Sequence, residues 1–378
     1  MSLKIEILKT EQELFAIKNE WQNLVERVQP DSIFLTYEWQ MQWWQNYHQQ
    51  FEHAQPAIIT VRDNQEGALL ALLPLFSHVK TFRAGQRFRT LQLMGTEIEP
   101  SDYLDIICPP EKKVAFLRKI FAEPRVLDFV TAHDVLILEN IDDNSSLLLE
   151  KNELDNLLNS VSYQYKIKVC PYLSLPETTE ALLAGLSRNF RSNLKRARNK
   201  LKRHGFQIET VTREDQLDAA IENLFSLHDR RFQAKQADSK FNYQRRGNFH
   251  KLVARTFLKN DWLQLYQILD RQKVVGSLYC FKFNHSMMYV QGGFDPDYAQ
   301  YGLGNQIILK AIEDAIALKF RKFDFMRGAE AYKFKWTKEK RDLHRIIIPL
   351  SLRAKIYFAA EDLALNFKNL IKKIIKRQ

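Results

Sequence analysis

Three kinds of feature are scarce in this 378-residue chain: cysteines, closely spaced histidines and long apolar runs. The three cysteines, Cys108, Cys170 and Cys280, are far apart and form no Cys-x-x-Cys pair. This excludes a disulfide framework and a cysteine-rich zinc site. No two of the nine histidines are four residues apart, so no helix face presents a pair of imidazole ligands. We therefore expect reduced, buried thiols and no catalytic metal.

No apolar run reaches about 18 residues, the length that a membrane-spanning helix needs. The start of the chain has no signal-type apolar segment, so we expect a cytoplasmic protein. Peripheral contact with the inner face of the membrane is part of this expectation. Hydrophobic residues make up 45% and charged residues 27% of the chain, as in ordinary folded domains. The length favours two domains.

Positive charge is concentrated in two segments. Lysine and arginine outnumber aspartate and glutamate by 56 to 45, which gives a net charge of +11. Residues 188–203 contain eight basic and no acidic residues, and residues 351–378 contain seven basic and two acidic ones. These segments carry +8 and +5, so the rest of the chain is at −2. The excess positive charge therefore belongs to two segments, and it bears on which partners their surfaces could bind.

Hydrophobic periodicity predicts one order of elements twice: a strand, two helices, a meander of three strands, and then further helices and strands. The first copy begins at Lys4 and the second near Phe206. This repetition predicts an α/β (α+β) protein with tandem domains, although no repeat is visible at the level of residues. We expect a first domain over 1–175, a second over 176–350 and a basic amphipathic helix over 351–378.

The basic segment is predicted to form a helix with one apolar and one cationic face. Leu183, Phe190, Leu194 and Leu201 recur at helical spacing, and Ser187 can cap a helix start. The cationic face suits a phosphate-rich cofactor, tRNA, an acidic polysaccharide or a lipid surface. Alternatively, this helix has no ligand: its charged face is in solvent, and the aliphatic parts of its lysine and arginine side chains cover apolar neighbours.

A glycine-containing segment after an expected strand suits an anion. Glycines let backbone amides approach a ligand, and a helix start adds free N–H groups. The segment lacks the lysine of a Walker loop, and a tight turn before a helix explains the glycines equally well. The candidate coenzyme-binding residues are Gln291, Gly292, Gly293, Tyr301, Gly302, Leu303, Gly304 and Asn305.

The order of these elements resembles the GNAT acyltransferase fold, whose glycine-rich loop holds the coenzyme A pyrophosphate. Three groups of residues are similar to the CelD-like acetyltransferase branch, which is associated with cellulose and exopolysaccharide biosynthesis and is related to Fem-type aminoacyltransferases. The sequence departs from the usual GNAT loop because Ala299 occupies its first position. The groups are Phe190, Arg191, Leu194, Arg196 and Leu201; Gly293, Phe294, Asp295 and Tyr298; and Phe323, Asp324, Phe325, Gly328, Tyr332, Lys333 and Trp336.

Acyl transfer needs a neutral nucleophile, a stabilised oxyanion and a proton for the leaving group. Asp324 and Glu330 are candidate proton acceptors, Tyr332 is a candidate donor, and Lys333 could face the oxyanion. Tyr332, Lys333 and Trp336 look like the counterpart of a Phe-Lys-x-x-Phe motif in Fem-like enzymes. Each residue taken singly also fits a structural role.

The candidate acceptor-binding residues are Asp102, Tyr103, Arg191, His228 and Trp336. His228 could instead act as a base near neutral pH or be structural. Near the C-terminus an apolar stripe suits either packing on the protein or an anionic membrane surface. Its members are Ile356, Ala360, Leu363, Phe367, Leu370, Ile371 and Ile374.

Together these features predict an acyltransferase that uses acetyl-CoA or another acyl-CoA and no metal. Its acceptor would be a sugar, amino or cell-envelope and exopolysaccharide precursor, a small molecule, glycan or peptide. One alternative is a Fem-like aminoacyltransferase that uses aminoacyl-tRNA. Another is a non-catalytic module that binds nucleic acid or polysaccharide, which the basic segments alone would explain.

Overall fold

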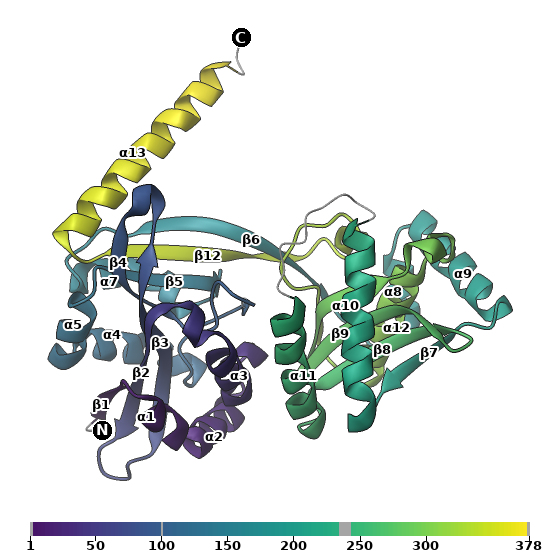
Figure 1. Ribbon diagram of the computed structural model, residues 1–378, viewed down its shortest axis with the longest axis horizontal. Coiled ribbons are helices and arrows are strands. Elements are labelled where there is room, and N and C mark those ends of the chain that lie inside the picture. Colours follow the sequence, from purple (N-terminus) through teal and green to yellow (C-terminus); the bar gives the residue numbers. More distant parts are fainter. Residues whose placement is uncertain (1–2, 100, 234–242, 376–378) are drawn as a thin grey trace.

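A single twelve-stranded mixed sheet runs through the molecule (Figure 1). The computed structural model describes residues 3–99, 101–233 and 243–375, with the side chains of all of these except 231–233, 243–244 and 366–375. The strand order is β1-β2-β3-β4-β5-β12-β6-β11-β10-β9-β8-β7. Strands β6 (Tyr163–Ser174) and β12 (Lys340–Pro349) lie in the middle and join two helix-covered halves.

The first half contains the expected opening strand, helices and meander. Thr10 caps its first helix: the Thr10 hydroxyl accepts from the Glu13 N–H at 3.2 Å, and the Glu13 carboxylate accepts from the Thr10 N–H at 3.0 Å. Together these two hydrogen bonds form a capping box. The strands are β1 (Leu3–Leu8), β2 (Glu52–Asp63), β3 (Leu69–Thr81), β4 (Arg87–Leu93) and β5 (Val135–Asp142), and the helices are α1 (Glu11–Ala16), α2 (Lys18–Val28), α3 (Tyr37–Tyr47), α4 (Lys113–Ala122), α5 (Pro124–Thr131), α6 (Ser146–Leu149) and α7 (Lys151–Leu157).

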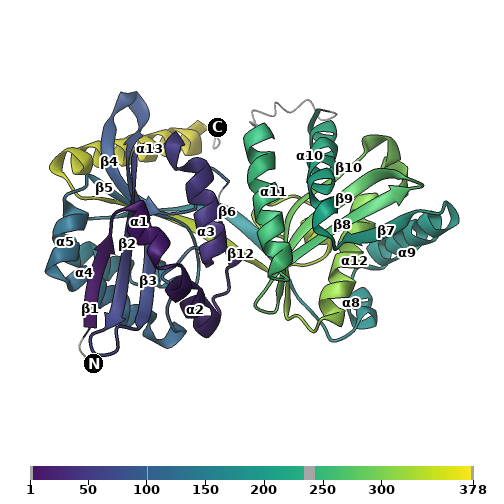
Figure 2. The same cartoon turned by 60° about the horizontal axis from the view of Figure 1, so that its bottom comes forward.

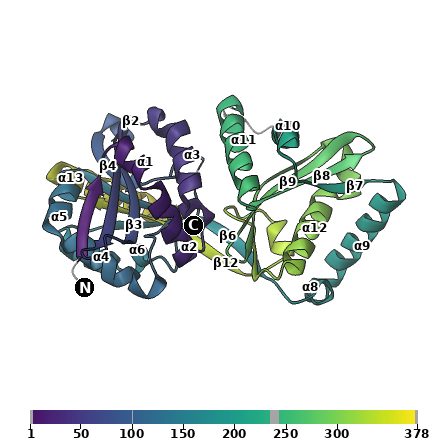
Figure 3. The same cartoon turned by 90° about the horizontal axis from the view of Figure 1, so that it is seen from below.

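In the second half, two pairs of helices cover opposite faces of the sheet (Figure 3). Helices α10 (Leu217–Gln233) and α11 (Tyr243–Lys259) pack on one face, and α9 (Arg188–Arg203) and α12 (Leu303–Ala317) pack on the other. The remaining elements are α8 (Thr179–Gly185), β7 (Gln207–Val211), β8 (Leu263–Asp270), β9 (Lys273–Phe283), β10 (Ser286–Phe294), β11 (Lys322–Asp324) and α13 (Leu352–Ile375).

The chain returns to the first half at its end. Strand β12 pairs with β5 as well as with β6, so the range 176–350 expected for the second domain contributes its last strand to the first half's side of the sheet. Helix α13 follows it and starts against the first half, where Ala354 and Phe358 are buried beside Phe88 (Figures 1 and 2). Of the expected apolar stripe along α13, Ile356 and Leu363 are 63% and 70% exposed, whereas Phe367 and Ile371 lie outside the described side chains.

Two helical stretches of the chain are each divided into two helices. The basic helix, expected from Leu183, divides into α8 and α9 because Ser187 caps α9, its hydroxyl accepting from the Phe190 N–H at 3.3 Å. In the first half, Glu150 separates α6 from α7. No helix among the described residues is long and apolar enough to cross a membrane.

A buried ion-pair network joins the two halves at β11. The Asp324 carboxylate, 1% exposed, accepts hydrogen bonds from the Arg341 guanidinium at 2.8 Å, from the Tyr103 hydroxyl at 3.0 Å and from the Met326 N–H at 2.9 Å. Arg341 also donates to Asp142 at 3.0 Å and lies 3.7 Å from the centre of the Tyr103 ring. Burial, together with the Asp324 charge, raises the pKa of Tyr103 well above its ordinary value. We call these residues the Arg341 network.

Replacing Arg341 by methionine should destabilise the protein strongly, because it leaves the buried Asp324 and Asp142 carboxylates without their cation. Breaking a buried pair in this way typically costs about 3–5 kcal/mol. Urea unfolding followed by circular dichroism measures the effect. The control is Arg213→Met, which removes one member of the exposed pair with Asp215 and should change stability by less than about 0.5 kcal/mol. Equal midpoints for the two variants would contradict the role of the network.

Candidate functional site

The site lies where two parallel strands separate. Strands β10 and β11 pair over only three residues, from Ser286–Lys322 to Met288–Asp324. Beyond this point the pairing of β10 with β9 shifts by one residue between Tyr289 and Gln291, which is a β-bulge at Val290. The two strands therefore diverge and leave a crevice whose walls are the residues that follow on each strand.

One cavity, of about 270 Å³, lies between β10 and the start of α12. We call it the glycine-loop cavity. Gly302, at φ 67°, is the N-cap of α12, and no side chain caps this helix. The amides of the first helical turn therefore point toward the cavity with the positive end of the helix dipole, an arrangement that suits phosphate. Its lining includes Gly292, Gly293, Ala299, Gly302, Leu303, Gly304 and Asn305, with Tyr289 and Tyr332.

The two other candidate coenzyme-binding residues lie elsewhere. Gln291 lines the neighbouring cavity described below. Tyr301 packs on Phe206, with ring centres 4.9 Å apart, and the Lys200 ammonium lies 4.5 Å from the centre of its ring. Tyr301 therefore has packing contacts and does not line the glycine-loop cavity.

The first glycine pair allows close packing around the crevice. A Cβ on Gly293 would lie 2.6 Å from the backbone nitrogen of His228, so only glycine lets α10 approach β10 here. A Cβ on Gly292 would lie 2.6 Å from the Tyr289 hydroxyl oxygen. Both glycines thus leave room for protein atoms that form the crevice.

A second cavity, of about 380 Å³, lies between the two halves, and we call it the interdomain cavity. The first half contributes Glu99 and Asp102. The second half contributes residues of α10, α11, β10 and the segment after β11. It shares Tyr289, Gly292 and Tyr332 with the glycine-loop cavity, so the two cavities adjoin. Its polar lining from the second half is His228, Arg246, Gln291, Arg327, Glu330 and Lys333.

A loop with unusual backbone angles forms the first half's wall. Glu97, Glu99 and Tyr103 have φ of 67°, 46° and 61°, in the left-handed region that non-glycine residues seldom adopt. Two tryptophans of α3 hold this loop: the Trp39 indole donates to the Ser101 hydroxyl at 2.7 Å, and the Trp43 indole donates to the Ile98 carbonyl at 2.6 Å. Strained backbone fixed by surrounding structure is common at functional sites.

The acceptor candidates Asp102 and Tyr103 both lie on this loop, in different environments. Asp102 lines the interdomain cavity and accepts from the Arg327 guanidinium at 2.6 Å. Tyr103 points into the Arg341 network and is 5% exposed. The structure thus places Asp102 at the cavity and Tyr103 in the support behind it.

Glu99 forms an interdomain contact that the sequence analysis did not identify. Arg246 donates to its two oxygens at 2.6 and 3.0 Å, and His250 lies 3.0 Å from one of them. Burial would raise the pKa of Glu99, but the His250 and Arg246 charges outweigh burial and lower it from 4.5 to about 2. The partners lie about 150 positions apart, so no local pattern indicates the contact.

The four candidate catalytic residues divide into two groups. Asp324 lines neither cavity, and both its carboxylate oxygens accept hydrogen bonds in the Arg341 network. These contacts favour a positioning role for Asp324. Glu330, Tyr332 and Lys333 line the interdomain cavity. The Glu330 side chain is 54% exposed, whereas Lys333 is buried.

Lys333 holds the segment after β11 in place. Its ammonium donates to the Arg327 carbonyl at 2.8 Å and to the Met326 carbonyl at 3.2 Å, and it pairs with Glu330 at 3.0 Å. An ammonium has three hydrogens, so these three acceptors occupy its donor capacity.

The remaining acceptor candidates are separated. His228 lines the interdomain cavity and contacts Gln291. Arg191 is exposed on α9 and donates to the Leu183 carbonyl at the end of α8. Trp336 is 3% exposed and packs edge-on against Phe190, with ring centres 4.9 Å apart. Of these three, only His228 reaches either cavity.

Comparisons with known proteins agree with this geometry. The family described as "Acetyltransferase (GNAT) domain" matches residues 188–334, which hold both walls of the glycine-loop cavity. The chain has a GNAT/Fem-like fold. A crystal structure of FemX matches over 95% of this chain and 99% of its own, at 9% identity and a TM-score of 0.62. A conserved protein of unknown function from Bacteroides thetaiotaomicron VPI-5482 matches over 91% and 100%, at 12% identity and 0.52.

The expected α/β fold class is therefore confirmed, whereas the relation to the CelD-like branch stays a prediction. No curated protein matches the sequence. Among the described residues, no group of three or more histidine, cysteine, aspartate or glutamate side chains could hold a metal ion.

Replacing Lys333 by methionine should destabilise the protein as well as reduce any activity, because the Met326 and Arg327 carbonyls lose their donor. Unsatisfied buried acceptors of this kind cost about 2 kcal/mol or more in total. The matched control is Lys335→Met, at an exposed position two residues away. If Lys333→Met keeps the unfolding midpoint of the control, the lysine does not hold this segment, and a direct role at the oxyanion becomes the better account.

The Glu99 contact should make stability depend on acid pH. Because its pKa is lower in the folded than in the unfolded chain, Glu99 stabilises the fold above about pH 4.5, and this contribution is lost as the pH falls toward 2. Unfolding midpoints measured from pH 6 to 3 should therefore fall more steeply for the parent protein than for Glu99→Gln. Glu66→Gln, in an exposed turn, should follow the parent. Parallel curves for Glu99→Gln and the parent would contradict the pKa assignment.

Proposed function

We propose that the protein is an acyltransferase that moves an acyl group from an acyl-CoA to a polar acceptor. The observation that carries this proposal is that the glycine-loop cavity and the interdomain cavity share Tyr289, Gly292 and Tyr332. A donor in one cavity and an acceptor in the other would meet at these residues. The GNAT family match over 188–334 supports the donor side.

The donor fits the glycine-loop cavity by its charge. The amides of Leu303, Gly304 and Asn305 at the start of α12 would hold the pyrophosphate, since a helix start favours anions. Apolar side chains, with Leu278, Ile307 and Ile308 among them, line part of the same cavity, which suits the uncharged arm between pyrophosphate and thioester. No lysine or side-chain cap is needed for this mode of binding.

The interdomain cavity suits a polar acceptor with hydroxyl or amino groups. Its charged side chains are arranged as pairs, Glu99 with Arg246, Asp102 with Arg327, and Glu330 with Lys333. Paired charges leave little net charge but many hydrogen-bonding groups. A sugar or amino precursor of an envelope or exopolysaccharide polymer belongs to this class.

Transfer would proceed by attack of the acceptor nitrogen or oxygen on the thioester carbonyl carbon. The new bond to this carbon forms, the carbon–sulfur bond breaks, and the acceptor loses a proton while the sulfur gains one. Glu330, the most exposed carboxylate of the cavity with its side chain 54% exposed, would accept the first proton. Tyr332 lines both cavities and would supply the second proton.

A second candidate is transfer of an aminoacyl group from tRNA, and the surface of α9 favours it. This helix carries eight basic residues. Among the contacts that the structure describes, Arg198 forms an ion pair with Glu313. Lys200 contacts the loop before α12, donating to the Gln300 carbonyl at 3.2 Å. The cationic face therefore reaches the edge of the glycine-loop cavity, where a phosphate backbone would be attracted.

Replacing Gly304 by valine should weaken coenzyme A binding at least tenfold, about 1.4 kcal/mol. A Cβ at this position already touches the Phe294 ring at 3.4 Å, and the two methyl groups would occupy the cavity beside the helix amides. Gly185→Val is the control, because its Cβ meets nothing within 4 Å. Isothermal titration calorimetry gives both affinities.

Unchanged coenzyme A affinity in Gly304→Val would remove the glycine-loop cavity from the donor site. Filter binding separates the two donors: the acyl-CoA proposal predicts calorimetric binding of coenzyme A without salt-dependent retention of tRNA. Retention of tRNA that falls steeply with salt, without coenzyme A binding, would replace the first candidate by the second.

A further inference from the structure

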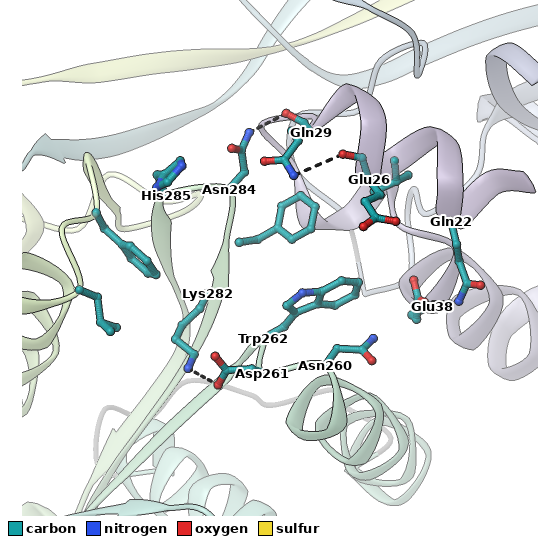
Figure 4. A pocket seen from close by; sticks show the side chains of 14 residues that line it. Gln22, Glu26, Gln29, Glu38, Asn260, Asp261, Trp262, Lys282, Asn284 and His285 are labelled. Carbon is teal, nitrogen blue, oxygen red and sulfur yellow. Dashed lines mark hydrogen bonds and ion pairs between the residues drawn. The ribbon is translucent and has the colours of Figure 1, made fainter. Parts of the chain in front are cut away.

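A third cavity, of about 640 Å³ (Figure 4), lies at the opposite end of β10 from the two cavities described above. It borders the turn between β9 and β10, whereas the proposed transfer site lies beyond the bulge at Val290. Both halves line it: α2 and the start of α3 on one side, and the turn with the segment before β8 on the other. A ligand here could not take part in the proposed transfer.

The floor of this cavity is aromatic. Trp262 and Phe283 meet edge-on with ring centres 5.4 Å apart, and Phe320 lines the same space. Trp262 is partly exposed, while the other five tryptophans of the chain are at most 3% exposed. A partly exposed indole in a concave site is a binding surface for apolar groups and for cations.

Two carboxylates line one side of the floor. In Figure 4, Glu26 and Glu38 lie on the same side of the Trp262 indole, and Lys282 lies on the other, beside Asp261. Lys282 pairs with Asp261 at 2.6 Å, so its charge is already matched. Glu38 accepts a hydrogen bond from the Gln22 amide at 2.6 Å.

Neither Glu26 nor Glu38 has a cationic partner within the described part of the chain. The cavity is therefore locally acidic in a protein whose net charge is +11. Aromatic faces beside unmatched carboxylates form an environment that favours an organic cation over a neutral or anionic molecule.

We propose that this cavity binds a small organic ammonium compound. Its apolar part would lie on Trp262 and Phe283, and its ammonium group would face Glu26 and Glu38. The size of the cavity is in the range of small-molecule sites. Because Asn284 on the β9–β10 turn also donates to the Gln29 carbonyl of the first half at 2.6 Å, a ligand here would bridge the same two surfaces.

A set of three probes with one chain length tests the proposal: hexylammonium, 1-hexanol and hexanoate. Protection of tryptophan fluorescence from acrylamide measures binding, since Trp262 is the indole that a quencher in solution reaches most easily. We expect hexylammonium to protect, hexanol to bind about tenfold more weakly, and hexanoate not to bind. Failure of millimolar hexylammonium to protect, or equal binding of hexanol, would overturn the proposal.

The double variant Glu26→Gln, Glu38→Gln assigns the binding to the carboxylates. It should weaken hexylammonium about tenfold, because amides keep the shape and the Gln22 hydrogen bond but lose the charge. Glu66→Gln removes one negative charge from an exposed turn of the first half and should leave the affinity unchanged. If the double variant binds as tightly as the parent, the ammonium does not face these carboxylates and the proposal is wrong. The single variant Glu26→Gln, at an exposed position, gives the same test should the double variant fold poorly.

Discussion

The Arg341–Asp324 ion pair fixes the geometry on which the candidate site depends. Arg341 belongs to β12, Asp324 ends β11, and Tyr103 comes from a loop of the first half, so one cluster joins three segments far apart in sequence. Both charges are buried, and a buried charge is stable only when its partner is held in place. The cluster thus fixes the end of β11 against the first half. It thereby also positions the segment that follows β11 and includes Met326 to Lys333.

From that point the site follows from strand geometry. Two parallel strands that stop pairing must diverge, and the bulge at Val290 turns β10 away from β11. One side of the crevice meets the uncapped start of α12, and the other meets the strained loop that carries Glu99 and Asp102. Tyr289 and Tyr332 lie at the junction. Two adjoining cavities therefore arise from one interrupted strand pair.

Features encoded locally could be predicted from the sequence, and features made by folding could not. The glycines and the helix start after Tyr301 are neighbours in the chain, so their local pattern can indicate a candidate binding loop, and most of these residues line the glycine-loop cavity. The Glu99–Arg246–His250 contact joins residues of different halves, and no spacing shows it. The sequence makes Asp324 a candidate proton acceptor, but it does not show that Arg341, on the strand β12 near the end of the chain, matches the Asp324 charge.

The central claim is that coenzyme A binds at the start of α12, beside β10. The most direct measurement is a titration of ¹⁵N-glycine-labelled protein with coenzyme A, since the twelve glycines sample both halves. The account predicts that the amide resonances of Gly292, Gly302 and Gly304 shift, while those of Gly67 and Gly85, in turns of the first half, stay unchanged. Saturable binding that leaves Gly302 and Gly304 unshifted would contradict it.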